Sequence, residues 1–222
     1  MFEEKDLVDK IMELSDAVLI VQQAQERLKT EQVRRQEFYQ QMTEDDKAEF
    51  VNGAILYHSP VAKAHNDSTG LLYILLHTYV NSHDLGFVGV EKILIQLSRN
   101  DYEPDLCFFG KEKAAAFTEQ QLLFPVPDFI AEVLSKSSTK TIEHDTVTKY
   151  KDYERHGVDE YWIIDPYDKT VSQYILKDSK YDLCLKAGEG IIQAAAIPGF
   201  SIPIAAIFEK QENLAALKDM LL

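Results

Sequence analysis

The chain has 222 residues, of which 45% are hydrophobic and 27% charged, a composition typical of a folded globular protein rather than a disordered one. Its 23 basic and 37 acidic residues give a formal charge of −14, which argues against strong nonspecific binding of nucleic acid. No run approaches about 18 consecutive apolar residues, so we expect no membrane-spanning segment and no membrane partner.

The cysteines and the N-terminal segment indicate the cellular setting. MFEEKDLVDK is acidic and mixed, unlike a cleavable secretory signal. Cys107 and Cys184 lie in apolar, strand-like stretches and are predicted to be small core residues rather than a disulfide. A reducing, cytoplasmic setting is the one we expect.

Residues 2 to about 33 contain neither Gly nor Pro and predict one long helix. Apolar residues recur there in steps of four and three, with one interruption, as in a coiled coil. These residues are Leu7, Ile11, Leu14, Val18, Val21 and Leu28, with Val8, Met12, Leu19 and Ile20 beside them. Two interpretations stay open: the helix packs on its own domain, or it is an arm for homodimerisation. We therefore divide the chain into a helical arm, 1–35, and a domain, 36–222.

Strand and helix signals alternate in the next hundred residues. Asn52-Gly53 between apolar residues predicts a hairpin. Residues 64–83 predict a helix capped by Asn66, Asp67 or Ser68. Strands are then expected within 86–98, 102–110 and 124–135.

The remaining elements indicate the fold class. A helix is predicted over 138–157, where Arg155-His156-Gly157 is a C-terminal signal. A buried strand at 160–166, a hairpin from 170–176 and 181–187, and a helix at 209–221 follow. This order predicts an α/β domain with a central mixed sheet flanked by helices. The sequence lacks a Gly-rich phosphate loop, so we expect no nucleotide cofactor.

Residues 128–136, DFIAEVLSK, place an acid, Glu132, inside an apolar strand. Alternation along that strand puts Ile130, Glu132 and Leu134 on one face, and Phe129, Ala131 and Val133 on the other. A buried carboxylate is costly unless it is paired or bound to a metal ion. Asp105, directly after a proline, begins another apolar strand, and a cation such as Mg²⁺ or Mn²⁺ would relieve repulsion between the two acids. A structural ion pair is the alternative.

The predicted helix that follows offers a cation. Asp145 and Lys149 are four residues apart and share one face of that helix. If the helix packs across the sheet, Lys149 reaches the two acids and stabilises charge on a phosphoryl oxygen. Spacing alone favours the alternative, an exposed pair worth about 0.3–0.5 kcal/mol.

Four blocks of the sequence resemble the Uma2 (DUF820) family, within the PD-(D/E)xK restriction-endonuclease-like superfamily. They read EFVNGAI, EPDLCFF, PDFIAEVLSKSS…DTVTKYKDYERHGVDEYWIIDP and IPGFSIPIAAIF, and they cover about residues 40–210. The third block is the most specific. The resemblance implies a restriction-endonuclease-like fold and Mg²⁺- or Mn²⁺-dependent hydrolysis of phosphodiester bonds in DNA. We also expect a homodimer, in which two sites would cut both strands and the N-terminal helix would supply the contact.

The resemblance also implies site residues. Asp105 matches the acid of the PD motif, and Glu132 matches the acid of the E-x-K motif. The simplest superfamily pattern has lysine at position 134, which is Leu134 here, and Lys149 on the following helix resembles the relocated lysine of the family. Glu49 matches an acid that completes the metal site, and Asp145 matches the acid four residues before the lysine.

Further residues receive supporting roles by the same resemblance. His65 matches a histidine that precedes the first long helix; substrate contact is one candidate role, and a helix cap or an exposed position is the favoured alternative. A basic lip for nucleic acid is one interpretation of the lysines near the site, and a solvated helix face is an equal one. These basic residues are Lys136, Lys140, Lys149, Lys151 and Arg155.

Two departures from the family pattern keep an alternative function open. VNGAI replaces a block that commonly reads near IDGEL, and the spacing from Glu132 to Asp145 is longer than usual, which leaves other lysines as alternatives to Lys149. The altered VNGAI block and the charge of −14 support a catalytically inactive nuclease-fold protein that acts as a binding or scaffold module. RNA or branched DNA as the substrate is a third interpretation.

Overall fold

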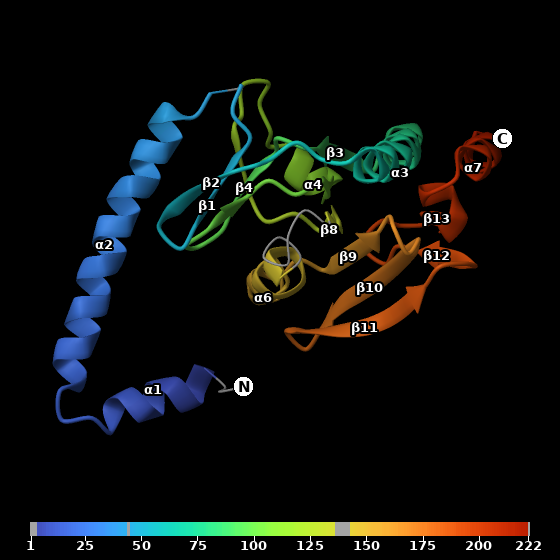
Figure 1. The fold of residues 1–222 in the computed structure, drawn as a ribbon. Coiled ribbons are helices and arrows are strands. Elements are labelled where there is room, and N and C mark those ends of the chain that lie inside the picture. Colours follow the sequence, from blue (N-terminus) through green and yellow to red (C-terminus); the bar gives the residue numbers. More distant parts are fainter. Residues whose placement is uncertain (1–3, 44, 136–142, 222) are drawn as a thin grey trace.

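The structure, a computed structural model, describes residues 4–43, 45–135 and 143–221 (Figure 1). Its helices are α1 (Glu4–Met12), α2 (Ala17–Gln41), α3 (Lys63–Ser82), α4 (Lys111–Ala114), the π-helix η1 (His144–Lys149), α6 (Tyr150–His156), the 3₁₀-helix η2 (Ile204–Ile207) and α7 (Lys210–Met220). Its strands are β1 (Ala48–Val51), β2 (Ala54–Tyr57), β3 (Gly86–Val90), β4 (Leu94–Gln96), β5 (Asp101–Tyr102), β6 (Leu106–Gly110), β7 (Leu123–Phe124), β8 (Phe129–Val133), β9 (Glu160–Asp165), β10 (Thr170–Lys177), β11 (Lys180–Ala187), β12 (Ile191–Gln193) and β13 (Ser201–Pro203).

The predicted mixed sheet is present, and a second sheet lies beside it. The larger sheet has six strands in the order β11-β10-β9-β8-β6-β3, and the smaller has five in the order β2-β1-β5-β4-β7. Within the larger sheet, β8 and β9 are parallel, whereas β6 and β8 are antiparallel. The stretch at 86–110, predicted as two strands, forms four, and they are divided between the two sheets.

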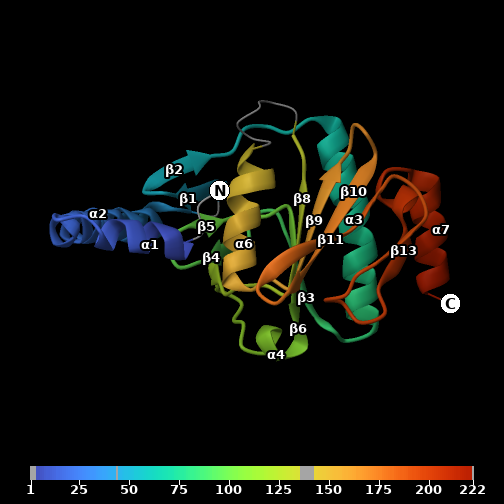
Figure 2. The ribbon, with the colours of Figure 1, turned by 90° about the horizontal axis from the view of Figure 1, so that it is seen from below.

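Helices cover both faces of the six-stranded sheet (Figure 2). On one face, Phe129, Ala131 and Val133 of β8 pack in a cluster with apolar residues of α3 and α7. On the other face, Ile130 and Leu134 pack with Tyr153 of α6. The predicted alternation along this strand is therefore confirmed, and Glu132 lies on the face that α6 covers.

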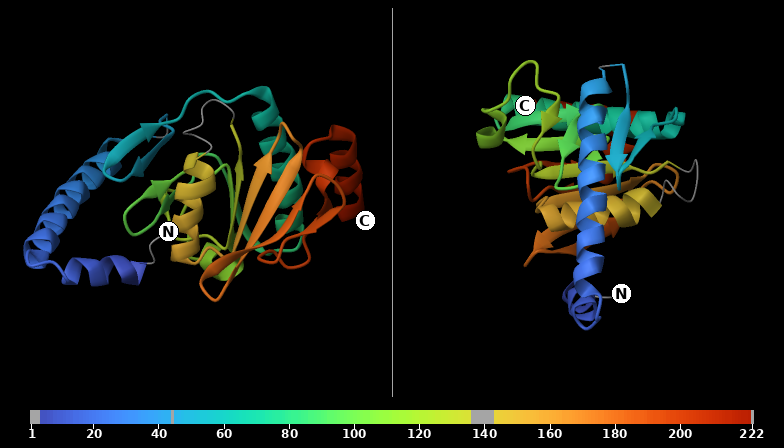
Figure 3. Two further views of the ribbon diagram at one scale, coloured as in Figure 1. Left: turned by 60° about the horizontal axis from the view of Figure 1, so that its bottom comes forward. Right: turned by 90° about the vertical axis from the view of Figure 1, so that its left-hand side faces the viewer.

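The N-terminal segment forms two helices that extend from the body of the protein rather than packing on it (Figures 1 and 3). The predicted single helix is broken between α1 and α2, and α2 continues to Gln41, beyond the proposed boundary at residue 35. The apolar stripe is exposed: Leu7 is 55% accessible, Val18 69% and Leu28 48%. Packing of this stripe on the domain, one of the two interpretations, is therefore wrong for the single chain.

Helix α2 is attached to the body by its C-terminal turns, beginning with Glu31, which forms an ion pair with Arg99. Phe38 is buried against Phe50 of β1, with their ring centroids 5.9 Å apart. The Arg35 guanidinium donates hydrogen bonds to both carboxylate oxygens of Asp101, at 2.7 and 2.5 Å, and Asp101 is fully buried. A buried, bidentate arginine–carboxylate pair fixes the direction of this helix.

Two local predictions differ from the structure. Helix α3 begins at Lys63, which forms an ion pair with Asp67, so the predicted caps at 66–68 lie inside the helix. Cys107 is buried as predicted, but Cys184 is exposed. The reason is a bulge in the β10–β11 pairing, where Gln173 opposes Leu185 and Tyr174 opposes Leu183. Cys184 is the extra residue between them, which breaks the alternation that the prediction assumed.

The hairpin at Asn52-Gly53 is confirmed, with φ of 51° and 81° at these two residues. Left-handed backbone at both central positions is the geometry that an Asn-Gly turn provides. Within the described ranges, no helix combines the length and the apolarity that crossing a lipid bilayer requires.

Candidate active site

The two predicted acids lie side by side on neighbouring antiparallel strands. β6 and β8 pair with Leu106 opposite Ala131, and one further step in this register brings Asp105 opposite Glu132. Both side chains are buried, at 7% and 3% exposure. The backbone N–H of Val133 donates a 2.7 Å hydrogen bond to Oδ2 of Asp105, which fixes this carboxylate against the strand that carries Glu132.

Lys149 lies beside Glu132 and is buried. Its Nζ is 2.9 Å from Oε1 of Glu132 and 2.8 Å from Oε1 of Glu49. The Tyr153 hydroxyl, one turn along the helix, donates to the same Glu132 oxygen at 3.2 Å. Lys149 is only 2% exposed. The alternative that the sequence spacing favoured, an exposed Asp145–Lys149 pair on a solvated helix face, is therefore wrong.

The helix that carries Lys149 begins with a π turn, where the sequence predicted a regular α-helix. Hydrogen bonds between residues five apart bring His144 and Lys149, five apart, onto one face. Both reach Glu49: His144 Nε2 is 2.9 Å from Oε2, and Lys149 Nζ contacts Oε1. In an α-helix, residues four apart would share the face instead. The side chain of Asp145 lies outside the described residues.

Glu49 belongs to β1 of the five-stranded sheet, so the site lies where the two sheets meet. Its Oε1 also accepts a 3.0 Å hydrogen bond from the backbone N–H of Glu103, and His58 Nε2 lies 3.7 Å from that oxygen. Both carboxylate oxygens of Glu49 are therefore contacted by other groups of the chain.

His65 is buried on α3 and contacts the other acid. Its Nε2 is 3.2 Å from Oδ2 of Asp105, whereas its Nδ1 makes no hydrogen bond to the described residues. The favoured alternative for His65, a helix cap or an exposed position, is wrong. Asp105 Oδ1 likewise makes no hydrogen bond to the described part of the chain, so one oxygen of this acid is open to a ligand.

These side chains line one cavity of about 390 Å³. Its lining includes four acids and five basic side chains: Glu49, Glu103, Asp105, Glu132, Lys47, His58, His65, His144 and Lys149. Such a volume lies in the range of small-molecule sites in proteins, about 300–1,000 Å³. The geometry is thus that of a buried acid–lysine cluster open to a ligand.

Comparison with known families matches residues 35–205 to the model of Uma2, described as "Putative restriction endonuclease". The chain belongs to the Uma2 family. The match includes every acid and histidine of the cavity and Lys149, and it leaves α1 and most of α2 outside.

The fold of this Uma2 chain is shared with a solved structure, a putative nuclease belonging to DUF820 from Anabaena variabilis. The two are 16% identical with a TM-score of 0.65, over 82% of this chain and 97% of the other. At this identity the likeness shows the fold alone. The comparison with curated proteins gave no match.

Burial and the neighbouring cations oppose each other in setting the pKa values of the Uma2 site. Burial would raise the pKa of Glu49, but the Lys149 ammonium and the His144 hydrogen bond outweigh it and lower that pKa to about 2. Burial also acts to raise the pKa of Asp105, and the contact with His65 leaves it lowered. Burial and the neighbouring Glu49 carboxylate raise the pKa of Glu103 to about 7, against the opposing effect of Lys47.

The carboxylate oxygens that line the Uma2 cavity are of the type that a hard divalent cation such as Mg²⁺ prefers as ligands. Among the described residues, no group of three or more His, Cys, Asp or Glu side chains is arranged to hold a metal ion, and Lys149 lies between two of the acids. Mg²⁺ commonly takes one or two carboxylates and keeps several waters, so a three-ligand group is not needed. Asp105 and Glu132 fit that requirement, and Asp105 Oδ1 makes no hydrogen bond to the described residues.

The other predicted Uma2 residues are distributed as follows. Lys151 is exposed and does not line the acidic cavity. Lys136 and Lys140 lie outside the described residues.

The sequence did not single out His58, His144 and Tyr153. His144 could be identified as a neighbour of Lys149 only from the π turn, which places residues five apart on one face. In an α-helix, the two side chains would lie on different faces. His58 directly follows β2, which pairs with the strand of Glu49 in the hairpin at Asn52-Gly53, so the register of this hairpin brings it near Glu49.

Proposed function

We propose that this protein is a divalent-metal-dependent endonuclease that hydrolyses phosphodiester bonds in DNA, with Asp105, Glu132 and Lys149 as catalytic residues. The observation that carries the proposal is the 2.9 Å contact between Glu132 and Lys149, beside Asp105, in a cavity that a ligand can enter. Membership of a family described as putative restriction endonucleases supports the same reaction class.

Lys149 is the residue that would stabilise the negative charge that develops on the phosphate during cleavage. A preorganised cation in a water-poor site stabilises negative charge on a phosphoryl oxygen more strongly than it would in water. Its burial and its two carboxylate partners hold the ammonium in place before substrate arrives.

Asp105 and Glu132 are the proposed ligands for Mg²⁺ or Mn²⁺, which when bound would act as a Lewis acid on the scissile phosphate. The resemblance adds Glu49 as a third ligand, although both of its oxygens already have partners. His65 is a supporting residue in this proposal because it fixes the Asp105 carboxylate from the helix side. Asp145 keeps the supporting role that the resemblance implies.

Nicking of supercoiled plasmid DNA tests the proposal. We expect wild type to cleave with Mg²⁺ or Mn²⁺ and to be inactive with EDTA, and Asp105→Asn to lose at least ~100-fold in rate. Equal behaviour of wild type and Asp105→Asn would remove the proposed active site.

A binding or scaffold module is the second candidate, and the position of Lys149 favours it. An ammonium that already neutralises two buried acids satisfies them without a metal ion. Calorimetric titration with Mn²⁺ separates the two functions. The nuclease proposal expects a site in wild type that Glu132→Gln abolishes, whereas the scaffold expects no binding in either protein.

The proposed assembly is a homodimer formed through the arm. The exposed apolar residues lie on two separate helices, Leu7 and Val8 on α1 and Val18, Val21 and Leu28 on α2, and a second copy would bury those of α2 as a coiled coil does. Two active sites in one dimer would allow both DNA strands to be cut.

A further inference from the structure

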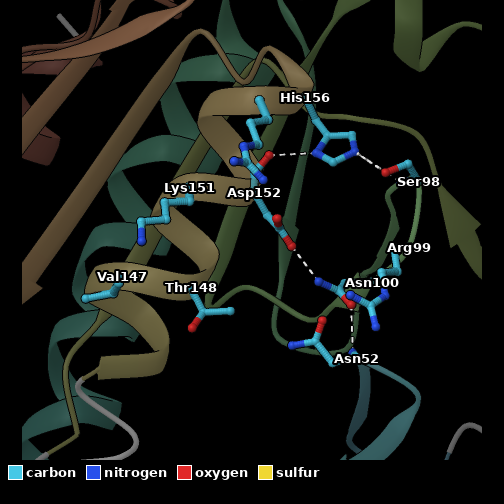
Figure 4. A pocket seen from close by; sticks show the side chains of 10 residues that line it. Asn52, Ser98, Arg99, Asn100, Val147, Thr148, Lys151, Asp152 and His156 are labelled. Atoms are coloured by element: carbon cyan, nitrogen blue, oxygen red, sulfur yellow. Dashed lines mark hydrogen bonds between the residues drawn. The ribbon is translucent and has the colours of Figure 1, made fainter. Parts of the chain in front are cut away.

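A second cavity, of about 610 Å³, is lined by the same helical segment as the active site but by different residues. Its wall combines the β1–β2 turn, residues 98–100, and the outward side of η1 and α6 (Figure 4). Thr148 and Lys151 face this cavity, whereas His144 and Lys149 line the acidic one. The helical segment 144–156 therefore separates two chemically different spaces.

The second cavity is basic within an acidic protein. Arg99, Lys151 and Arg155 line it, against one carboxylate, Asp152. Asp152 Oδ2 is occupied by hydrogen bonds from Asn100 Nδ2 and the Tyr102 hydroxyl, both at 2.6 Å. Arg99 already forms a bidentate ion pair with Glu31, at 2.8 and 2.9 Å, so the excess of positive charge comes from Lys151 and Arg155, although the whole chain carries a charge of −14.

Hydrogen bonds hold the wall of this cavity in a fixed shape. His156 Nε2 accepts a 3.2 Å hydrogen bond from the Ser98 backbone and lies 2.8 Å from the Ser98 hydroxyl. Asn100 Oδ1 accepts a 2.8 Å hydrogen bond from the Asn52 backbone. These contacts, visible in Figure 4, tie the three wall segments together, so little ordering remains when a ligand binds.

The buried side chain of Tyr102 contacts one group from each of the two cavities. Its hydroxyl donates to Asp152 in the basic cavity, and its ring centroid is 5.7 Å from the Lys149 ammonium. Asp152 of the basic cavity and Lys149 of the acidic cavity therefore lie near the same side chain. A polyanion with regularly spaced charges matches that arrangement better than a single small anion does.

We infer that the basic cavity binds backbone phosphates of the nucleic-acid strand next to the bond that is cut. Arginine and lysine side chains bind phosphate oxygens, and the neutral donors of Asn52 and Thr148 add contacts that carry no sequence preference. The inference rests on the proposed nuclease function and gives it a substrate-binding surface. It also explains how a strongly acidic chain holds a polyanion: the attraction is local.

The test measures how salt weakens binding of a fluorescent DNA duplex in EDTA, where cleavage does not occur. The variants are Lys151→Gln with Arg155→Gln, and the control is Lys186→Gln, an exposed lysine on β11 outside both cavities. Each phosphate contact contributes about −0.9 to the slope of log K against log salt. The double variant should therefore have a slope less negative than that of wild type by about 2. Lys186→Gln should leave it unchanged.

A slope and affinity unchanged in the double variant would overturn the inference, as would absence of salt-dependent DNA binding by wild type. Competition by a mononucleotide as strong as by the duplex would show a site for a free nucleotide rather than for a strand, and would also overturn it. Failure of the nuclease proposal looks different: wild type would bind DNA with the expected slope and yet not nick plasmid with Mg²⁺.

Discussion

Glu49 contacts several groups of the candidate active site. It contacts Lys149, His144 and the Glu103 backbone, and it comes from a different sheet than the two other acids. A carboxylate whose oxygens are both engaged in this way positions the lysine, and a metal ion would have to displace one of these contacts. The role of Glu49 can therefore be separated experimentally from the roles of Asp105 and Glu132.

Replacing Glu49 by Gln removes the charge and keeps the shape. We expect Mn²⁺ affinity, measured by calorimetry, to stay within about threefold of wild type, while the cleavage rate falls ~10- to 100-fold because Lys149 is less well held. If Glu49→Gln instead lost the Mn²⁺ site as completely as we expect for Glu132→Gln, Glu49 would be a metal ligand.

The lowered pKa of Glu49 also makes stability depend on pH. The ordinary pKa is 4.5 and that of the folded protein is about 2, so the stabilisation is present above pH 4.5 and is lost as pH falls towards 2. The shift corresponds to a contribution on the order of 3 kcal/mol. Urea unfolding in EDTA at pH 5 and at pH 3 should show a larger loss for wild type than for Glu49→Gln. Parallel losses would contradict this assignment.

The elements show what could be predicted from the sequence. The strand with Glu132 was predictable because alternation of apolar residues fixes its two faces, and the hairpin at Asn52-Gly53 because its backbone geometry is local. The π turn was not, since nothing in the sequence of residues 144–149 distinguishes it from an α-helix. The contact of Lys149 with Glu49 depends on that turn and on the meeting of two sheets, which is a tertiary property.

A second prediction at the scale of the elements concerns the ion pair that attaches α2 to the body of the protein. Arg35→Met leaves the buried Asp101 carboxylate without its arginine, which should lower the free energy of unfolding by about 3–5 kcal/mol. Arg34→Met, the exposed neighbour, is the matched control and should change it by less than about 0.5 kcal/mol. Chemical denaturation measures both, and equal effects would show that the ion pair does not hold the helix.

At the scale of the whole molecule, charge and exposed apolar surface are unevenly distributed. The net charge of −14 coexists with a cavity lined by three basic residues, and the apolar stripe is concentrated on the arm. The amino-acid composition gives the net charge and the apolar fraction of the whole chain, but it could not locate the basic cavity or the apolar stripe. The heptad pattern could be read from the sequence, whereas its exposure in the single chain required the structure.

The arm predicts the state of association. Replacing Leu14, Val18 and Val21 by Ser should convert a dimer to a monomer, because these exposed residues would form the contact between copies. Leu183→Ser, at an exposed leucine of β11, should leave the dimer intact. Sedimentation velocity distinguishes the two states, and a wild-type monomer at high concentration would contradict the proposal.

The measurement that tests the active site most directly is the cleavage rate of Lys149→Met under single-turnover conditions. Lys47→Met is its control, because Lys47 lines the same cavity and pairs with Glu91 at its rim. We predict that folded Lys149→Met loses at least ~100-fold in rate, whereas Lys47→Met stays within about threefold of wild type. A Lys149→Met protein that cleaves DNA as fast as wild type would contradict the account.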